Sequence, residues 1–147
     1  MLTLKDKVVL ITGGGSGIGL ATAHTLGSLG AKIAICGRKP DRIEAAKADL
    51  EKRGITVHAG TCDIREVEQI AAFVDAAGAA LGRATILVNN AGGQFPTTAD
   101  TLTPRGWEAV IRNNLNGTFF MTQAAATKFM IPARRGSIVN IVANVRR

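Results

Sequence analysis

Residues 8–19 carry the pattern that most constrains the fold of this chain. Four aliphatic residues at 8–11 precede Thr12, and five of the next seven residues are glycine. A short apolar run that ends in glycines is typical of a buried strand followed by a tight turn. Glycine lets the backbone approach a diphosphate closely, and a following helix offers unpaired N–H groups and a positive dipole end. The segment therefore predicts a phosphate-binding turn.

The spacing of these glycines separates the turn from two common nucleotide motifs. A G-x-G-x-x-G fingerprint would need glycine where Ile18 or Thr22 stands, and a P-loop would need Gly-Lys-Ser/Thr at its end. The pattern present is Thr-Gly-x-x-x-Gly-x-Gly, beginning at Thr12.

Strand-like and helical patterns alternate along the rest of the chain. Strands are expected near residues 7–12, 32–37, 55–59, 85–89 and 137–142. Helices are expected from Gly17 to Gly30, from an Asp41-x-x-Glu44 capping box to Gly54, over 67–81, and from Thr103-Pro104 toward Met130. Right-handed crossovers then predict an α/β fold, a Rossmann-type doubly wound parallel sheet of order 3-2-1-4-5. We expect a single domain over residues 1–147.

Charge and composition narrow the class of partner. The chain has 18 basic and 11 acidic residues, a formal charge of +7, no Tyr and one Trp. The basic residues are scattered, and no basic surface interleaved with aromatic residues is evident, so nucleic acid and membrane are not expected partners. A phosphorylated cofactor or a coenzyme A substrate suits the charge, and a solvated surface is the alternative. The charged start and short apolar runs favour a soluble, cytoplasmic protein.

Cysteine and histidine give no metal-ligand pattern. Cys36 and Cys62 lie 26 residues apart without a Cys-x-x-Cys pair, and each falls near the end of an expected strand. We therefore expect no metal, and interpret both cysteines as small buried side chains in a reducing compartment. His24 and His58 are interpreted as structural.

Five motifs in order resemble the short-chain dehydrogenase/reductase family. They are the glycine turn, Asp63 after the third strand, Asn-Asn-Ala-Gly at 89–92, Asn-Leu-Asn-Gly at 114–117, and Gly-Ser-Ile-Val-Asn-Ile at 136–141. Glycine-rich turns of another α/β protein are the alternative explanation.

The resemblance implies a set of cofactor-binding residues. Pyrophosphate would lie against the turn, at Gly13, Ser16, Gly17, Ile18 and Gly19. Adenine would lie near Asp63 and Ile64, and the loop with Asn90 and Gly92 would border the cofactor, although Asn90 has a purely structural alternative. The family counterpart of Asn114 positions a water in proton relay; a local helix kink without a catalytic role is the competing interpretation.

Arg38 bears on which dinucleotide is bound. A carboxylate after the second strand would accept both ribose hydroxyls and repel a 2′-phosphate, but Cys36-Gly37-Arg38-Lys39 stands here. Arg38 is suited to bind a 2′-phosphate through charge-assisted hydrogen bonds of about 1.5–3 kcal/mol each. The sequence therefore favours NADP(H) over NAD(H); a solvated turn before Pro40 is the alternative.

Two further features concern the reaction. Residues 92–95 and 141–147 resemble the branch that reduces enoyl-CoA and dienoyl-CoA thioesters, and Ala143 stands where most family members carry a catalytic Ser. Family catalysis also uses a Tyr-x-x-x-Lys pair, and this chain contains no Tyr. We expect a domain truncated after the fifth strand, without the family's later strands. Full-length members commonly form homo-oligomers.

Three functional hypotheses follow. The first is an NADP(H)-dependent oxidoreductase that reduces an enoyl-CoA-like thioester. The second is a non-catalytic dinucleotide-binding fragment. The third is a chain that does not fold stably, because residues 138–142 would form an apolar sheet edge.

Overall fold

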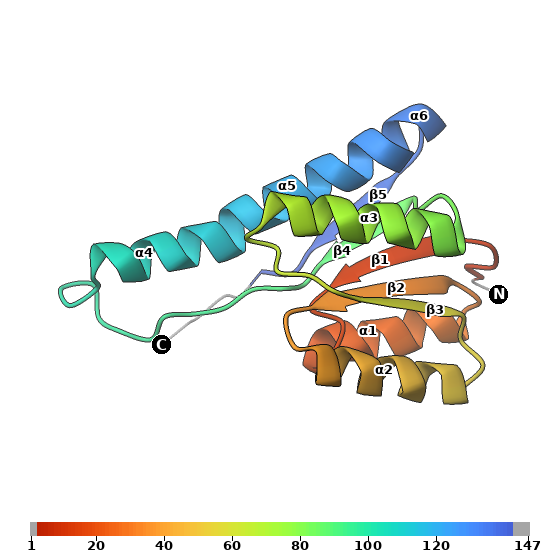
Figure 1. Cartoon of the computed structure of the whole chain (residues 1–147), viewed down its shortest axis with the longest axis horizontal. Helices are drawn as coiled ribbons and strands as arrows, with labels where there is room; N and C mark the ends of the chain where they lie inside the picture. Colours follow the sequence, from red (N-terminus) through yellow and green to blue (C-terminus); the bar gives the residue numbers. More distant parts are fainter. Residues whose placement is uncertain (1–2, 143–147) are drawn as a thin grey trace.

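A five-stranded parallel sheet organises the computed structural model, which describes residues 3–142. The strand order is β3-β2-β1-β4-β5 (Figure 1). The strands are β1 (Val8–Thr12), β2 (Lys32–Gly37), β3 (Val57–Thr61), β4 (Ile86–Asn89) and β5 (Ser137–Asn140). This order confirms the predicted doubly wound topology.

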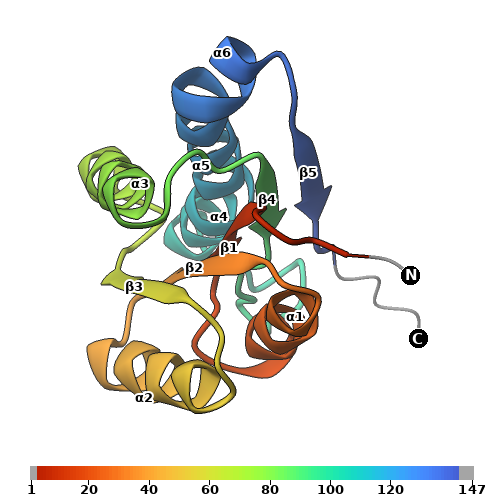
Figure 2. The same ribbon diagram turned by 90° about the vertical axis from the view of Figure 1, so that its right-hand side faces the viewer.

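Helices cover both faces of the sheet. On one face lie α1 (Gly17–Ser28) and α2 (Pro40–Lys52); on the other lie α3 (Val67–Leu81) and a long helix (Figure 2). The long helix runs through α4 (Pro104–Ile111), the π-helical segment η1 (Arg112–Asn116), α5 (Gly117–Ala125), the π-helical segment η2 (Ala126–Met130) and α6 (Ile131–Ala133). The predicted helix from Thr103-Pro104 toward Met130 is therefore present, but its pitch changes twice.

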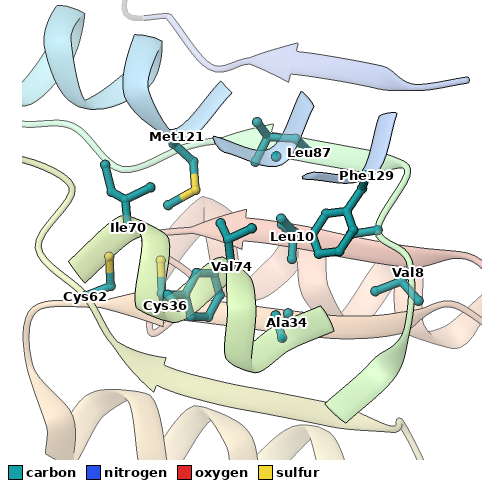
Figure 3. Packing of buried hydrophobic residues seen from close by; sticks show 14 of the residues in the cluster. Val8, Leu10, Ala34, Cys36, Cys62, Ile70, Val74, Leu87, Met121 and Phe129 are labelled. Carbon is teal, nitrogen blue, oxygen red and sulfur yellow. The ribbon is translucent and has the colours of Figure 1, made fainter. Parts of the chain in front are cut away.

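Strand β1 lies at the centre and supplies side chains to two separate cores. All five of its residues are buried, and successive side chains point to opposite faces. Leu10 packs with Leu87, Val74 and Phe129 on the face toward α3 and α5 (Figure 3). Val9 and Ile11 belong to the core beneath α1 and α2. This double burial explains why the strand is apolar at every position from 8 to 11.

The third strand lies two residues later than expected. Ile55 was expected to begin it, but the strand starts at Val57. Ile55 instead follows the turn after α2, where its N–H donates to Leu50 O at 3.2 Å. Its side chain fills the space beside Gly27, where an added Cβ would lie 2.6 Å from Ile55 Cδ1. Ile55 was therefore assigned to the strand because it is apolar, although it packs against a helix instead.

The capping box expected at the start of the second helix is also wrong. Helix α2 begins at Pro40, and its N-cap residue Lys39 makes no side-chain capping hydrogen bond. Proline at the first helical position has a φ angle already suited to the helix, and its missing N–H costs no hydrogen bond there. Asp41 accordingly lies inside the first turn rather than before it.

Strand β5 forms one edge of the described sheet. It pairs with β4, and all four of its residues are exposed. Ile138 is 40% and Val139 46% exposed. The expected apolar edge is therefore confirmed. Among residues 3–142, the structure contains no helix with the length and apolar character needed to span a membrane.

We expect Leu10→Ala to lower the free energy of unfolding by about 2–5 kcal/mol, because it leaves a cavity between β1 and α3. Denaturant unfolding checks this change. Leu115→Ala is the matched control, since its side chain is 61% exposed and should change stability by only about 0.5 kcal/mol. Equal effects of the two substitutions would contradict the assignment of the core.

Candidate functional site

A cleft of about 340 Å³ lies at the carboxyl ends of β1, β2 and β4. The chain leaves β1 toward β2 on one side, whereas β4 pairs on the other side. Such a reversal of strand order opens a crevice outside the strand ends, where ligands of doubly wound sheets bind. The turn after β1, the start of α2, and the segments after β3 and β4 form its walls.

The glycine turn forms one wall through Gly13, Gly15 and Ser16. Gly13 has a φ of 66° and Gly17 a φ of 53°, in the left-handed region that favours glycine. Gly19 is needed for a different reason: a Cβ there would lie 2.3 Å from the Gly13 carbonyl oxygen. Glycine at these positions therefore lets helix α1 begin directly against the turn.

The start of α1 is arranged to receive an anion. Its N-cap residue, Ser16, makes no side-chain capping hydrogen bond, and the first turn contains no acidic side chain. The first N–H groups of a helix lack carbonyl partners within the helix, and the helix dipole is positive at this end. Gly17, Ile18 and Gly19 form this first turn but do not line the cleft, and Ile18 is 63% exposed. Their contact with a cofactor stays a prediction.

Asn90, the residue directly after β4, holds the glycine turn in place. Its Nδ2 donates to Thr12 O at 3.1 Å and to Gly13 O at 3.2 Å. In return, Thr12 Oγ1 accepts hydrogen bonds from the backbone N–H groups of Asn90 and Ala91, at 3.0 and 2.9 Å. Asn90, Ala91 and Gly92 also line the cleft. These contacts support the structural interpretation of Asn90, and Thr12 is a partner that sequence reasoning did not select.

Arg38, Lys39 and Arg42 give the cleft a strongly basic wall. None of the three takes part in the ion pairs formed within residues 3–142. Arg38 was expected here, whereas Arg42 was not selected from the sequence. Pro40 could have indicated Arg42. A helix that starts at Pro40 places Arg42 in its first turn, close to Arg38 and Lys39.

The segment after β3 closes the other side of the cleft with Cys62 and Ile64. Asp63 lies between them in the sequence but does not line the cleft, and its carboxylate pairs with Arg65. Arg65 Nε lies 2.9 Å from Asp63 Oδ1, and Arg65 Nη2 lies 2.5 Å from Asp63 Oδ2. Hydrogen bonding from the Arg65 side chain lowers the pKa of Asp63, which burial partly opposes. Asp63 is thus an ionised side chain paired with arginine, and its adenine contact stays a prediction.

Asn114 anchors the loop after β4 to the long helix. Its Oδ1 accepts from Gly93 N at 3.0 Å, and its Nδ2 donates to Gly93 O at 2.8 Å and to Val110 O at 3.0 Å. Gly92 leaves room for this side chain, because an added Cβ would lie 2.7 Å from Asn114 Oδ1 and would displace it. Asn114 lies in the π-helical segment η1, and the cleft is lined by its neighbour Asn113 instead.

Asn113 was not selected from the sequence, because the family resemblance pointed to its neighbour Asn114. Segments of π-helix inside α-helices frequently occur at functional sites. The helix distortion that was the competing interpretation is present, and a relay role for Asn114 stays a prediction.

Two expectations have no structural outcome at this site. Ala143 lies outside the described residues. Within residues 3–142, no group of three or more His, Cys, Asp and Glu side chains is arranged to hold a metal ion.

Comparisons with known proteins agree with this geometry. A family model described as short chain dehydrogenase matches residues 7–146. A probable 2,4-dienoyl-CoA reductase from Bacillus subtilis is 38% identical over 140 residues, covering 95% of this chain and 55% of the relative. D-threitol dehydrogenase from Mycolicibacterium smegmatis is 40% identical over 140 residues, covering 94% and 53%.

A solved structure of an actinorhodin polyketide ketoreductase variant with NADPH has 34% identity and a TM-score of 0.91, covering 93% of this chain and 53% of that one. This chain therefore spans about half the length of the relatives it matches. Because the family model covers nearly every residue and the sheet order agrees, this chain belongs to the short chain dehydrogenase family.

Proposed function

We propose that this chain binds NADP(H) in the cleft and forms the cofactor-binding part of an oxidoreductase. The main support is the basic wall of Arg38, Lys39 and Arg42. It lies beside the start of α1, which has no side-chain capping hydrogen bond. No carboxylate is among the described residues that line this cleft. The 2′-phosphate of NADP(H) would therefore be attracted by the basic side chains of this wall. A carboxylate directly after β2, which would repel the phosphate, is not present.

The residues present fit such a cofactor. Backbone N–H groups of the glycine turn and of the first turn of α1 would bind the pyrophosphate. Arg38 and Arg42 would hold the 2′-phosphate, while Cys62 and Ile64 would offer an apolar wall to the adenosine. When bound, the nicotinamide supplies a hydride. Asn90 and Asn114 would keep the turn and the 91–95 loop in place around it.

We further propose an enoyl-CoA-like thioester as the substrate class. Residues 92–95 and Ala143 support this choice, as does similarity to a dienoyl-CoA reductase. Relatives that are named ketoreductases and a polyol dehydrogenase are about equally similar, so this preference rests mainly on those residues. The net charge of +7 suits an acyl donor that carries several phosphates.

A non-catalytic dinucleotide-binding fragment is the second candidate. The sequence has no Tyr, and it spans about half the length of its relatives. Binding and turnover distinguish the two proposals. Tight NADPH binding without reduction of any thioester or carbonyl compound would favour the fragment.

For the cofactor, we expect Arg38→Asp to weaken NADPH binding by about tenfold or more relative to NADH, a difference of about 1.4 kcal/mol or more. Fluorescence titration with both cofactors measures this ratio. Arg83→Asp is the matched control, because it makes the same charge change on an exposed residue outside the cleft. An unchanged NADPH-to-NADH ratio in Arg38→Asp would remove this side chain from cofactor selection.

For the loop, we expect Asn114→Ala to lower the free energy of unfolding by about 1–3 kcal/mol, because two backbone groups of Gly93 lose their partner. Asn116→Ala is the matched control, since Asn116, like Asn114, is an exposed asparagine of the same π-helical segment, whereas the hydrogen bonds to Gly93 come from Asn114. Denaturant unfolding should separate the two variants, with Asn116→Ala close to the unsubstituted protein. Equal stability of both variants would contradict the anchoring role.

For the substrate, we expect the oxidoreductase of which this chain forms the cofactor-binding part to consume NADPH with a short trans-2-enoyl-CoA. Its kcat/KM should be higher than with a 3-ketoacyl-CoA of equal chain length. The two thioesters share the coenzyme A portion, so their comparison isolates the reacting group. Faster reduction of the 3-ketoacyl-CoA would contradict the proposed substrate class while leaving the cofactor proposal intact.

A further inference from the structure

Two cysteines lie on neighbouring chain segments near the cleft, and the proposed function gives their thiols no chemical role. Cys36 pairs in register with Gly60, so Cys62 stands two residues further along the neighbouring chain segment. Cys62 N donates to Gly37 O at 3.0 Å, which keeps the two backbones adjacent beyond the end of β3. Residues two apart in an extended segment face the same side. Figure 3 shows both sulfur atoms on the side of the sheet toward α3.

The two thiols differ in their surroundings. Both thiols are buried, with Cys62 1% and Cys36 0% exposed, but Cys62 lines the cleft and Cys36 does not. Cys36 therefore lies behind Cys62 as seen from the cleft. A small reagent that enters the cleft meets Cys62 first, and Cys36 is the adjacent thiol.

We propose that Cys62 is a thiol-oxidation site in the wall of the cofactor cleft, and that Cys36 resolves the oxidised sulfur into an intramolecular disulfide. The oxidant is a small peroxide, represented by hydrogen peroxide. The proposal rests on the adjacent positions of the two cysteines and on Cys62 being the one that lines the cleft. It goes beyond the proposed function, and only its protection by NADPH depends on that function.

The reaction proceeds in two steps. The Cys62 thiolate attacks one peroxide oxygen; an S–O bond forms, the O–O bond breaks and hydroxide leaves, which gives a sulfenic acid. Cys36 then attacks the Cys62 sulfur; an S–S bond forms, the S–O bond breaks and the hydroxyl leaves as water with the Cys36 proton. Peroxide accepts two electrons, and two thiols become one disulfide.

The electrostatics of the pair agree with these roles. A hydrogen bond from the Cys36 thiol lowers the pKa of Cys62, while burial and the Asp63 charge oppose that change. The same interaction, together with complete burial, raises the pKa of Cys36 well above its usual range. The thiolate is the nucleophile in such reactions, so Cys62 is the thiol suited to attack first.

Peroxide treatment of the purified protein tests the proposal. After the remaining free thiols are blocked by alkylation, we expect peptide mass mapping to find residues 36 and 62 joined, and a reducing agent to release them. In Cys36→Ala, Cys62 should stop at the sulfenic acid and form an adduct with dimedone. In Cys62→Ala, Cys36 should stay reduced and alkylate only after unfolding.

Oxidation in the presence of NADPH tests whether Cys62 lies in the cofactor cleft. NADPH at ten times its Kd should slow the oxidation of Cys62 about elevenfold, because only the free protein exposes the cleft. Bound NADPH that leaves the rate unchanged would overturn the placement of Cys62 in the cofactor cleft. A protein that forms the disulfide but fails to bind NADPH would overturn the proposed function alone.

Three outcomes would overturn the oxidation site itself. In the first, both thiols stay reduced at peroxide concentrations that oxidise free cysteine. In the second, the unsubstituted protein keeps a sulfenic acid at Cys62 while Cys36 stays a thiol. In the third, a disulfide joins either residue to another chain. Circular dichroism of each variant confirms that it is folded before its thiols are compared.

Discussion

The hydrogen bonds between Thr12 and Asn90 are the constraint on which the site depends. They join the ends of β1 and β4, the two strands that diverge into opposite halves of the fold. The Thr12 hydroxyl accepts two backbone N–H groups that would otherwise lie unpaired beside the cleft. The Asn90 amide in turn holds the carbonyl groups of Thr12 and Gly13. These hydrogen bonds thus fix the position of the turn, although glycine residues have high conformational freedom.

The topology could be predicted from the sequence because each step depends on a local rule. Apolar runs separated by amphipathic helices require a parallel sheet, and right-handed crossovers leave few strand orders. Boundaries were less predictable, because one apolar side chain serves several purposes. Ile55 packs between helices rather than in a strand, and Pro40 starts α2 without any capping side chain.

The candidate site was predicted in part, for a related physical reason. Gly13, Ser16 and Arg38 follow directly from strand ends, so their meeting at one edge is a consequence of topology. Arg42 and Asn113 reach the cleft because of the rotation of their helices about the helix axis. That rotation could not be predicted from residue type. Asp63 differs again: its partner Arg65 is two residues away, yet the pairing depends on the loop conformation.

The π-helical segment η1 has a consequence for the long helix as a whole. A π-helical turn accommodates one extra residue without breaking the helix, so α4 and α5 are offset by about 100° of rotation relative to an uninterrupted α-helix. The buried face of α5, with Met121 and Ala125, is therefore phased independently of α4. Chain length between residues 112 and 116, rather than residue identity alone, sets which side of α5 enters the core. Related sequences that are one residue shorter there would need a different set of apolar positions in α5 to fill the same space against the sheet.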